Sequence, residues 1–190
     1  ASEIGRYGVR VFADTPVVKI DPTGIRKRVF TPSGRLRASH IVLAGNVHLG
    51  NLLRRLTETL APAWRHVAVT APLGDGIKSA MTYEGAVTGN DGVERFRVVD
   101  GDRLMWSHRI TTWDISPALL AGAVQRRIRN VFPQLGKVAI DHAWSGAIGR
   151  TIHGMPQIGQ LRPGLWLASG FGDNGIAIQA INGGSLTALD

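Results

Sequence analysis

The run Gly170-Phe171-Gly172-Asp173-Asn174-Gly175 has the GxGxxG spacing that can present backbone amides to a cofactor. It follows the apolar stretch 165–169 and precedes a segment compatible with a helix. Unpaired N–H groups at a helix start, together with the helix dipole, favour a phosphate or any ligand edge that gains negative charge. Glycines at a strand-to-helix turn can also serve close packing alone, and an isolated GxGxxG does not decide between these two interpretations.

A dinucleotide-binding βαβ unit needs a second strand and an acidic residue about 20 residues beyond the glycines. The sequence reaches only Asp190. We therefore do not expect the glycine run to open a self-contained Rossmann domain.

Composition excludes several other kinds of chemistry. The 190 residues contain no cysteine, which excludes disulfides, thiolate metal sites, cysteine nucleophiles and a cysteinyl cofactor link. The histidines outside the glycine-rich region show no metal-ligand spacing, and no metal site is expected: His40, His48, His66, His108 and His142. No apolar run approaches about 18 residues and no signal peptide is visible, so a cytoplasmic protein without a membrane span is expected.

Positive charge is concentrated in the first part of the chain. Residues 1–70 hold 11 Lys/Arg against 4 Asp/Glu, within a formal net charge of +8. Such a region can attract nucleic acid, lie beside phosphates or dock an acidic partner segment. Its basic residues alternate with strand and helix patterns and no nucleic-acid motif accompanies them, so nucleic acid is not an expected partner.

The elements that must position the glycine run begin with four short strands, separated by turn sequences. We expect them at Gly8 to Ala13, Pro16 to Ile20, Ile25 to Phe30 and Leu36 to Gly45. Residues 41–45 are apolar on both faces, which is typical of a central parallel strand. Leucines at helical spacing from Leu49 to Leu60 then predict a helix that ends before Pro62.

The middle of the chain has a different pattern. Residues 64–110 read as antiparallel sheet, with hairpin signals at 90–92 and 100–102. Ser116 as N-cap and Pro117 at the first helical position start a second helix, which Gly136 ends. Strands are then expected at 138–140 and 165–169, and a closing helix from about Asn174 that looks cut. The fold class is mixed α/β (α+β).

Several motifs in a fixed order extend the signal of the glycine run. They are Trp144-Ser145-Gly146, the stretch 151–159 with Met155-Pro156-Gln157-Ile158-Gly159, Pro163-Gly164-Leu165-Trp166, and the glycine run itself. Together they resemble the C-terminal signature of the FAD-dependent D-amino-acid oxidase, glycine oxidase and sarcosine oxidase family. Within it, the chain is most similar to gamma-glutamylputrescine oxidase-like bacterial oxidoreductases. Stretches 8–17, 37–45, 103–106 and 131–135 extend the resemblance over nearly all of the chain.

This resemblance implies an incomplete glutathione-reductase-like FAD domain plus an antiparallel-sheet substrate domain. The implied segments are 1–62 for the second half of the FAD domain, 63–137 for the substrate domain, and 138–190 for the return to the flavin-ring end. Members of the family begin with a GxGxxG βαβ unit, and none occurs here ahead of residue 45. The chain is thus expected to be a C-terminal half, whose partner is the missing N-terminal half in the same or another polypeptide.

The resemblance further implies FAD as cofactor, not linked through a cysteine, and hydride transfer from the carbon that bears the amine to flavin N5. The implied cofactor-binding residues are Val17, Ala44, Gly45, Gly146, Pro156, Gly170, Phe171, Gly172, Asp173, Asn174, Gly175 and Ile176. Amides at 172–175 would stabilise negative charge on the N1/C2=O edge of the flavin. The substrate is expected to be a small amine or amino acid.

Two side chains are candidates for the catalytic site. Substrate carboxylates in this class are commonly held by an arginine, and Arg109 is the candidate, with a solvated strand-end charge as its alternative. His153 is an acid–base candidate or a structural hydrogen-bond partner. Many members of the family carry an aspartate at the position of His153, and a Gly-His or Ser-Gly-His turn at Asp173-Asn174. Trp106, Trp113 and Trp144 could wall an apolar amine pocket or pack in the core.

The function expected on these grounds is an FAD-dependent oxidoreductase that oxidises the C–N bond of an amine or amino acid. A second hypothesis from another class is a non-catalytic α/β subunit that docks an acidic partner through its basic N-terminal region. The sequence does not identify the amine or the electron acceptor.

Overall fold

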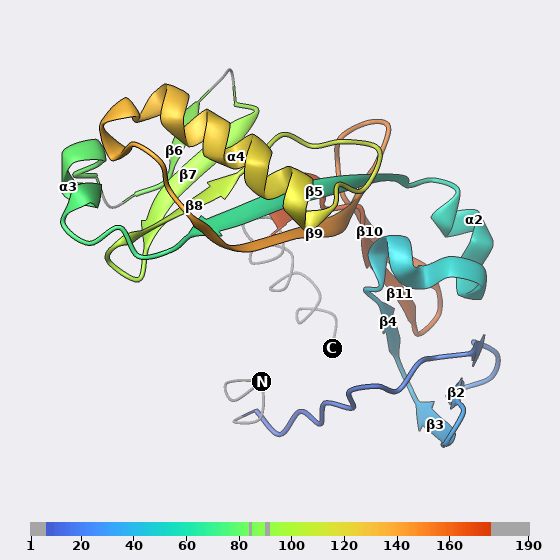
Figure 1. Cartoon of the computed structure of the whole chain (residues 1–190). Helices are drawn as coiled ribbons and strands as arrows, with labels where there is room; N and C mark the ends of the chain where they lie inside the picture. Colours follow the sequence, from blue (N-terminus) through green and yellow to red (C-terminus); the bar gives the residue numbers. More distant parts are fainter. Residues whose placement is uncertain (1–6, 84, 90–91, 176–190) are drawn as a thin grey trace. The chain divides into compact units, whose positions relative to one another are not determined.

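The computed structural model describes residues 7–83, 85–89 and 92–175 (Figure 1). The chain divides into two compact units. The first comprises residues 1–60 and 151–190, and the second comprises residues 61–150. The domain boundaries expected from the sequence are 62/63 and 137/138. The return to the first unit comes later because residues 140–150 form a long strand that pairs within the second unit.

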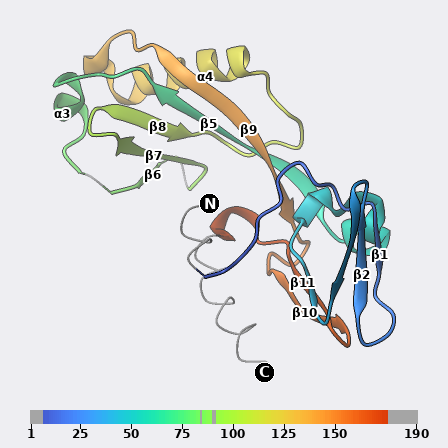
Figure 2. The same ribbon diagram turned by 90° about the horizontal axis from the view of Figure 1, so that it is seen from below.

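The first unit contains two small sheets (Figure 2). One is the antiparallel sheet of β1 (Lys19–Asp21), β2 (Lys27–Thr31) and β3 (Gly34–Ala38). The other has the order β10-β11-β4, with β10 (Gln157–Arg162), β11 (Leu165–Ser169) and β4 (Ile41–Leu43). Strand β4 runs parallel to β11, as expected, but it covers only 41–43 of the strand expected at 36–45, and it is an edge strand of the described sheet, not a central one, with Val42 exposed.

The leucines after β4 form shorter helices than their spacing predicts. The segment comprises η1 (Asn46–Leu53) and α2 (Arg54–Thr57). Gly50 interrupts it, because its φ of 50° and ψ of −132° are not helical. Leu49 still packs with Leu43 and the leucines of β11 in a small core. The expected strand at 8–13 does not form, and Val9 and Val11 are exposed.

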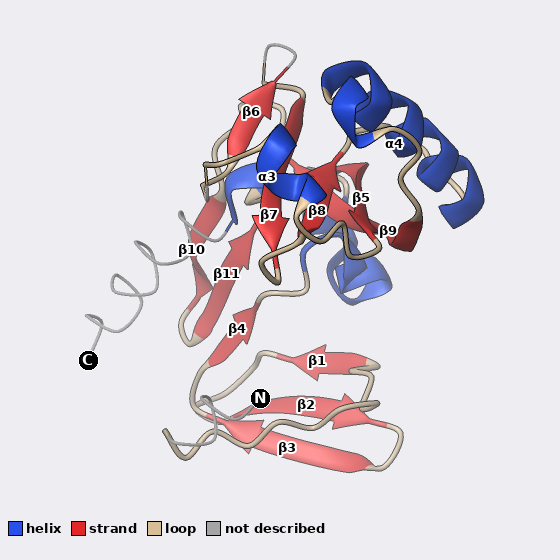
Figure 3. Ribbon diagram, turned by 60° about the vertical axis from the view of Figure 1, so that its left-hand side comes forward, coloured by secondary structure: helices blue, strands red, loops and turns tan. Residues whose placement is uncertain are grey.

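The second unit is a five-stranded antiparallel sheet with the order β6-β7-β8-β5-β9. Its strands are β5 (Ala61–Thr70), β6 (Val87–Gly89), β7 (Glu94–Val99), β8 (Arg103–Ser107) and β9 (Ile140–Arg150). The helical elements are α3 (Gly76–Ala80), α4 (Pro117–Val131) and η2 (Pro133–Leu135). Figure 3 shows α4 on one side of the sheet.

The start of α4 matches the sequence prediction. The Ser116 hydroxyl accepts a hydrogen bond from the Leu119 amide at 3.5 Å, and Pro117 is the first helical residue. The helix buries Leu120, Val124 and Ile128 against the sheet. These residues recur every four positions, so one stripe of the helix faces the core.

Candidate cofactor-binding site

The carboxyl ends of β4 and β11 lie side by side. The two strands pair in parallel, with Ile41 opposite Leu165 and Leu43 opposite Leu167. The side chains of Leu43, Leu165 and Leu167 are buried, which fixes this pairing. Ligands of open α/β sheets bind outside the carboxyl ends of parallel strands. The segments that follow the two strands, Gly45-Asn46 and Ser169-Gly170, are therefore the place to look for a cofactor.

Asn46 joins these two segments. Its side-chain oxygen accepts hydrogen bonds from the Gly170 amide at 3.3 Å and from the buried Ser169 hydroxyl at 3.4 Å. Asn46 itself has a φ of 50°, a conformation that asparagine adopts more readily than most residues. Asn46 is not among the site residues predicted from the sequence. Its position directly after the Ala44-Gly45 strand end is a local signal, but its partner is more than 100 residues away.

The first two glycines of the run have different surroundings. Gly170 and Gly172 both have left-handed φ values, 70° and 57°. A Cβ atom at Gly170 would lie 2.7 Å from Thr151 Cγ2 and 3.1 Å from Leu60 Cδ2. A Cβ atom at Gly172 would meet no atom of the described protein within 4 Å. Gly170 therefore serves close packing, whereas the backbone at Gly172 borders open space.

Most of the other implied cofactor residues of the first unit follow β4 or β11 in the chain. Ala44 and Gly45 are exposed at the end of β4, beside Asn46. Phe171 follows Gly170, and η3 (Gly172–Asn174) contains Asp173 before the chain reaches Gly175. Ile176 lies outside the described residues. Pro156 immediately precedes β10, whose neighbour is β11.

His153 stabilises a turn. Its Nδ1 accepts a hydrogen bond from the Met155 amide at 3.1 Å, and the Thr151 hydroxyl donates to the Met155 carbonyl at 2.7 Å. Because Nδ1 is the acceptor, a neutral His153 carries its proton on Nε2. The imidazole is exposed. This geometry supports a structural role for His153. Only Nε2 remains available to exchange a proton with a ligand.

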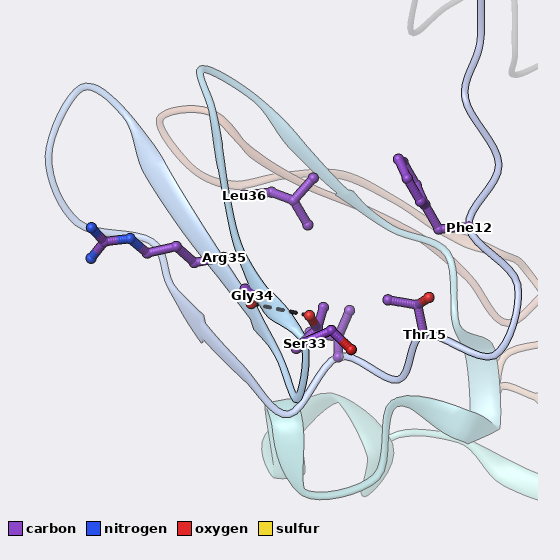
Figure 4. Close-up of a pocket in the computed structure, with 8 residues that line it drawn as sticks. Phe12, Thr15, Ser33, Gly34, Arg35 and Leu36 are labelled. Carbon is purple, nitrogen blue, oxygen red and sulfur yellow. Dashed lines mark hydrogen bonds between the residues drawn. The ribbon is translucent and has the colours of Figure 1, made fainter.

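A separate hollow of about 440 Å³ lies beside the β2–β3 hairpin, and Val17 is the only implied cofactor residue that lines it (Figure 4). Phe12, Val17 and Leu36 supply apolar surface, and Thr15 supplies a hydroxyl. The Arg35 guanidinium extends away from Phe12 and Thr15 (Figure 4). This hollow thus gathers none of the residues at the β4 and β11 ends.

In the second unit, Arg109 and Gly146 lie on different parts of the sheet. Arg109 is exposed in the segment that follows β8. Gly146 is exposed on β9, opposite Arg65 of β5. Trp106 is 1% exposed and stacks on Phe96 with ring centroids 4.7 Å apart, so it is a core residue and not the wall of an amine pocket. Trp113 and Trp144 are 59% and 47% exposed.

A buried carboxylate ties α4 to the sheet of this unit. Glu94 is 3% exposed and accepts hydrogen bonds from Arg127 Nη2 at 2.6 Å and Nε at 2.9 Å, and contacts His108 Nδ1 at 2.7 Å. Burial alone would raise the pKa of Glu94, but the hydrogen bonds from Arg127 and His108 outweigh it and hold that pKa below its usual value. For His108, burial lowers the pKa despite the neighbouring carboxylate. The sequence alone does not predict that Glu94, Arg127 and His108 come together.

His66 is the second buried titratable group of this unit. Its Nδ1 lies 2.7 Å from Ser145 Oγ and its Nε2 lies 2.7 Å from Thr111 Oγ1. The Thr111 hydroxyl donates to the Trp113 carbonyl, so it accepts from Nε2–H, and Nδ1 accepts from Ser145. Burial lowers the pKa of His66. The neutral imidazole thus fastens the segment before α4 to the sheet.

No described helix is long and apolar enough to cross a membrane. Within residues 7–83, 85–89 and 92–175, no cluster of three His, Asp or Glu side chains could hold a metal ion.

Solved structures that superpose on this chain include a glycine oxidase and an L-proline dehydrogenase. Glycine oxidase from Geobacillus kaustophilus superposes with a TM-score of 0.78 at 21% identity, covering 96% of this chain and 49% of that one. L-proline dehydrogenase from P. horikoshii superposes with a TM-score of 0.70 at 20% identity, covering 90% of this chain and 48% of that one. These likenesses establish the class of fold, a part of the fold of FAD-dependent oxidases.

The family follows from the sequence comparison. Residues 1–189 match the model of the DAO family, FAD dependent oxidoreductase, and the chain belongs to this family. A probable oxidoreductase OrdL of Rhizobium meliloti is 25% identical over 178 residues, which are 94% of this chain and 42% of that protein. Gamma-glutamylputrescine oxidoreductase of Escherichia coli is 24% identical over 192 residues, covering 100% of this chain and 45% of that protein. The chain therefore spans less than half the length of these relatives.

Proposed function

We propose that the polypeptide containing this chain is an FAD-dependent oxidoreductase that oxidises the C–N bond of an amine or amino acid. The observation that carries this proposal is the junction at Asn46, where the ends of β4 and β11 meet and the backbone of Gly172 borders open space. Bound FAD would supply the oxidising chemistry by accepting a hydride, so the protein needs neither a nucleophile nor a metal.

The residues present fit a flavin ring at this junction. Open space at Gly172 admits a planar group close to the backbone, which a side chain there would occupy. The amides at 172–175 belong to a short helical segment that follows the glycine turn, and the start of a helical segment favours negative charge. Pointing at the flavin, they would stabilise negative charge on its N1/C2=O edge. Ala44 and Gly45 are exposed at the end of β4, beside this junction.

The adenosine end is proposed to lie against Val17. The neighbouring hollow offers the apolar surface that a purine ring needs. The pyrophosphate would be held by sequence that the relatives have beyond the part matched by this chain, because a glycine-rich βαβ unit is needed for it. That region is proposed to be the chain's partner, in the same or another polypeptide.

The substrate is proposed to be a small amine or amino acid. Relatives in sequence and fold carry names that refer to gamma-glutamylputrescine, glycine and L-proline, all of which have an oxidisable C–N bond. Arg109 stays a candidate for binding a substrate carboxylate, since its guanidinium is exposed. His153 is proposed to keep the 151–155 turn in place beside β10, not to transfer a proton.

Equilibrium binding of FAD tests the proposed ring site. Gly172→Leu places a side chain in the open space, and Gly136→Leu is the matched control, because Gly136 has a φ of 61° and no atom within 4 Å of its Cβ position. Both variants place a leucine at a positive φ and so incur a backbone cost, which tests the control severely because the ψ of −133° at Gly136 lies outside the left-handed helical region. We expect Gly172→Leu to weaken FAD binding at least about tenfold, which is 1.4 kcal/mol, and Gly136→Leu to bind like the parent. Equal FAD affinities of the two variants would show that the flavin ring does not lie at Gly172.

A further inference from the structure

The small sheet of β1, β2 and β3 in the first unit has an apolar face and a basic face. Successive side chains of a strand point to opposite faces, so the register assigns each residue to one of them. Ile20, Val29 and Leu36 lie opposite one another in the register and share a face. Ile20 packs from this face against the small core that contains Leu43. Figure 4 shows that Arg35 and Leu36 point in opposite directions. The residues that share the face with Arg35, which we call the basic face, are Lys19, Asp21, Arg28, Phe30 and Arg37.

The basic face carries far more positive than negative charge. It has four basic side chains, all of them exposed, and one acidic side chain. The acidic one is Asp21, whose Oδ2 lies 3.8 Å from Arg28 Nη1, while its Oδ1 accepts hydrogen bonds from the amide and hydroxyl of Thr23. Arg35 and Arg37 form no ion pair with any residue in the part of the chain that the structure describes. The positive charge of β3 is therefore not neutralised by described residues.

Stability of the sheet does not explain this arrangement. Arg28 and Arg37 lie directly opposite each other on neighbouring strands, and like charges in such a pair destabilise a sheet. Charged side chains on an edge strand can prevent pairing with another sheet, which accounts for arginines on β3. It does not account for Arg28, because β2 is the central strand. A carboxylate bound across β2 and β3 would offset the repulsion through charge-assisted hydrogen bonds.

The spacing of the basic groups matches an extended polypeptide. Arg35 and Arg37 are two residues apart on β3, so their Cα atoms are about 6.6 Å apart. The same distance separates alternate residues of any extended chain. Arg28 lies one strand spacing from Arg37, which is about 4.8 Å, and Lys19 lies two spacings from Arg35. Acidic residues at alternate positions of one extended segment would therefore reach both arginines of β3.

The aromatic residue of the basic face favours carboxylates over nucleic acid. Proteins that bind single-stranded nucleic acid stack its bases on aromatic rings. Phe30 lies between Lys19 and Arg35 in the register and is only partly exposed. The Lys19 ammonium lies 5.8 Å from the centre of the Phe30 ring, a cation–π contact that engages one face of the ring. Phe30 is thus already in use within the sheet, whereas the guanidinium groups of β3 are not.

We propose that the basic face is a docking surface for an extended acidic segment of another protein, in which carboxylates at alternate positions bind Arg35 and Arg37. Arg28 and Lys19 contribute less, because Asp21 lies beside Arg28 and Lys19 contacts Phe30. This inference goes beyond the proposed function. It concerns the first unit alone and requires no step of the flavin chemistry.

Fluorescence anisotropy of labelled probes tests the surface on the polypeptide that contains this chain, with FAD present. Two peptide probes carry the same charge: Glu-Thr repeated four times, and Glu-Thr-Thr repeated four times. Consecutive glutamates of the second peptide point to opposite sides of an extended chain. A single-stranded oligothymidylate with four phosphates is the third probe. The variant is Arg35→Gln/Arg37→Gln, and the matched control is Arg126→Gln/Arg129→Gln, which removes two exposed charges from α4.

We expect the parent to bind the Glu-Thr peptide at least about threefold more tightly than the Glu-Thr-Thr peptide. Arg35→Gln/Arg37→Gln should lose about fivefold in affinity for the Glu-Thr peptide, a size typical of two exposed ion pairs, and the α4 control should bind like the parent. Equal affinities of the parent for the two peptides, or of the two double variants for the Glu-Thr peptide, would overturn the inference. Tighter binding of the oligothymidylate than of the Glu-Thr peptide would also overturn it and assign the basic face to nucleic acid.

Discussion

Replacing Gly170 by alanine tests whether the first glycine of the run is needed for packing. The new Cβ would lie 2.7 Å from Thr151 Cγ2 and 3.1 Å from Leu60 Cδ2, both inside normal contact distance. The φ of 70° adds a left-handed penalty of about 1–2 kcal/mol, and overpacking adds about 1–3 kcal/mol. Gly170→Ala should therefore lower the free energy of unfolding by about 2–5 kcal/mol. Gly172→Ala, with a similar φ and no neighbour, should lose only the first part.

Urea unfolding followed by circular dichroism measures both variants. The contact with Thr151 can be isolated, because Thr151→Ser removes Cγ2 and keeps the hydroxyl that donates to the Met155 carbonyl. In the Thr151→Ser background, Gly170→Ala should cost about 1–2 kcal/mol less than in the parent, an interaction energy within the range for contacting residues. Equal losses for Gly170→Ala and Gly172→Ala, or no coupling to Thr151, would refute the assignment of Gly170 to packing.

Three further predictions concern the second unit. Burial lowers the pKa of His66 in the folded state, so the unfolded state binds more protons below pH 6.5 and the free energy of unfolding should fall as the pH falls through that value. Urea midpoints measured from pH 8 to 5 should show a shallower pH dependence in His66→Gln than in the parent. Glu94→Gln should cost about 2 kcal/mol in urea unfolding at pH 7, since it leaves Arg127 and His108 without their carboxylate, whereas Glu58→Gln, at an exposed helix pair, should cost under about 0.5 kcal/mol. Ser116→Ala should lose about 0.5–1 kcal/mol in the same assay by removing the N-cap of α4, and an unchanged midpoint would show that Pro117 suffices.

Local chemistry explains which elements the sequence predicted well. The start of α4 was predictable because Ser116 and Pro117 themselves favour a helix N-terminus. The parallel pairing of 41–43 was predictable because buried parallel strands are apolar on both faces. The strand expected at 8–13 has suitable alternation, but a strand also needs a hydrogen-bonded neighbour, and the described chain supplies none there. The helix expected from 49 to 60 is interrupted because the leucine spacing carries no information on the backbone of Gly50.

Long-range contacts explain what the sequence did not predict. Asn46 and Gly170 follow different strands, and the parallel register of β4 and β11 brings them within hydrogen-bonding distance. The GxGxxG spacing likewise treats its glycines as equivalent, whereas Gly170 is enclosed by Thr151 and Leu60 and Gly172 is not. A packing interpretation and a cofactor interpretation of the run are therefore compatible, because each applies to a different glycine. It follows that substitutions at 170 should act on stability and substitutions at 172 on flavin binding, a separation that neither interpretation alone requires.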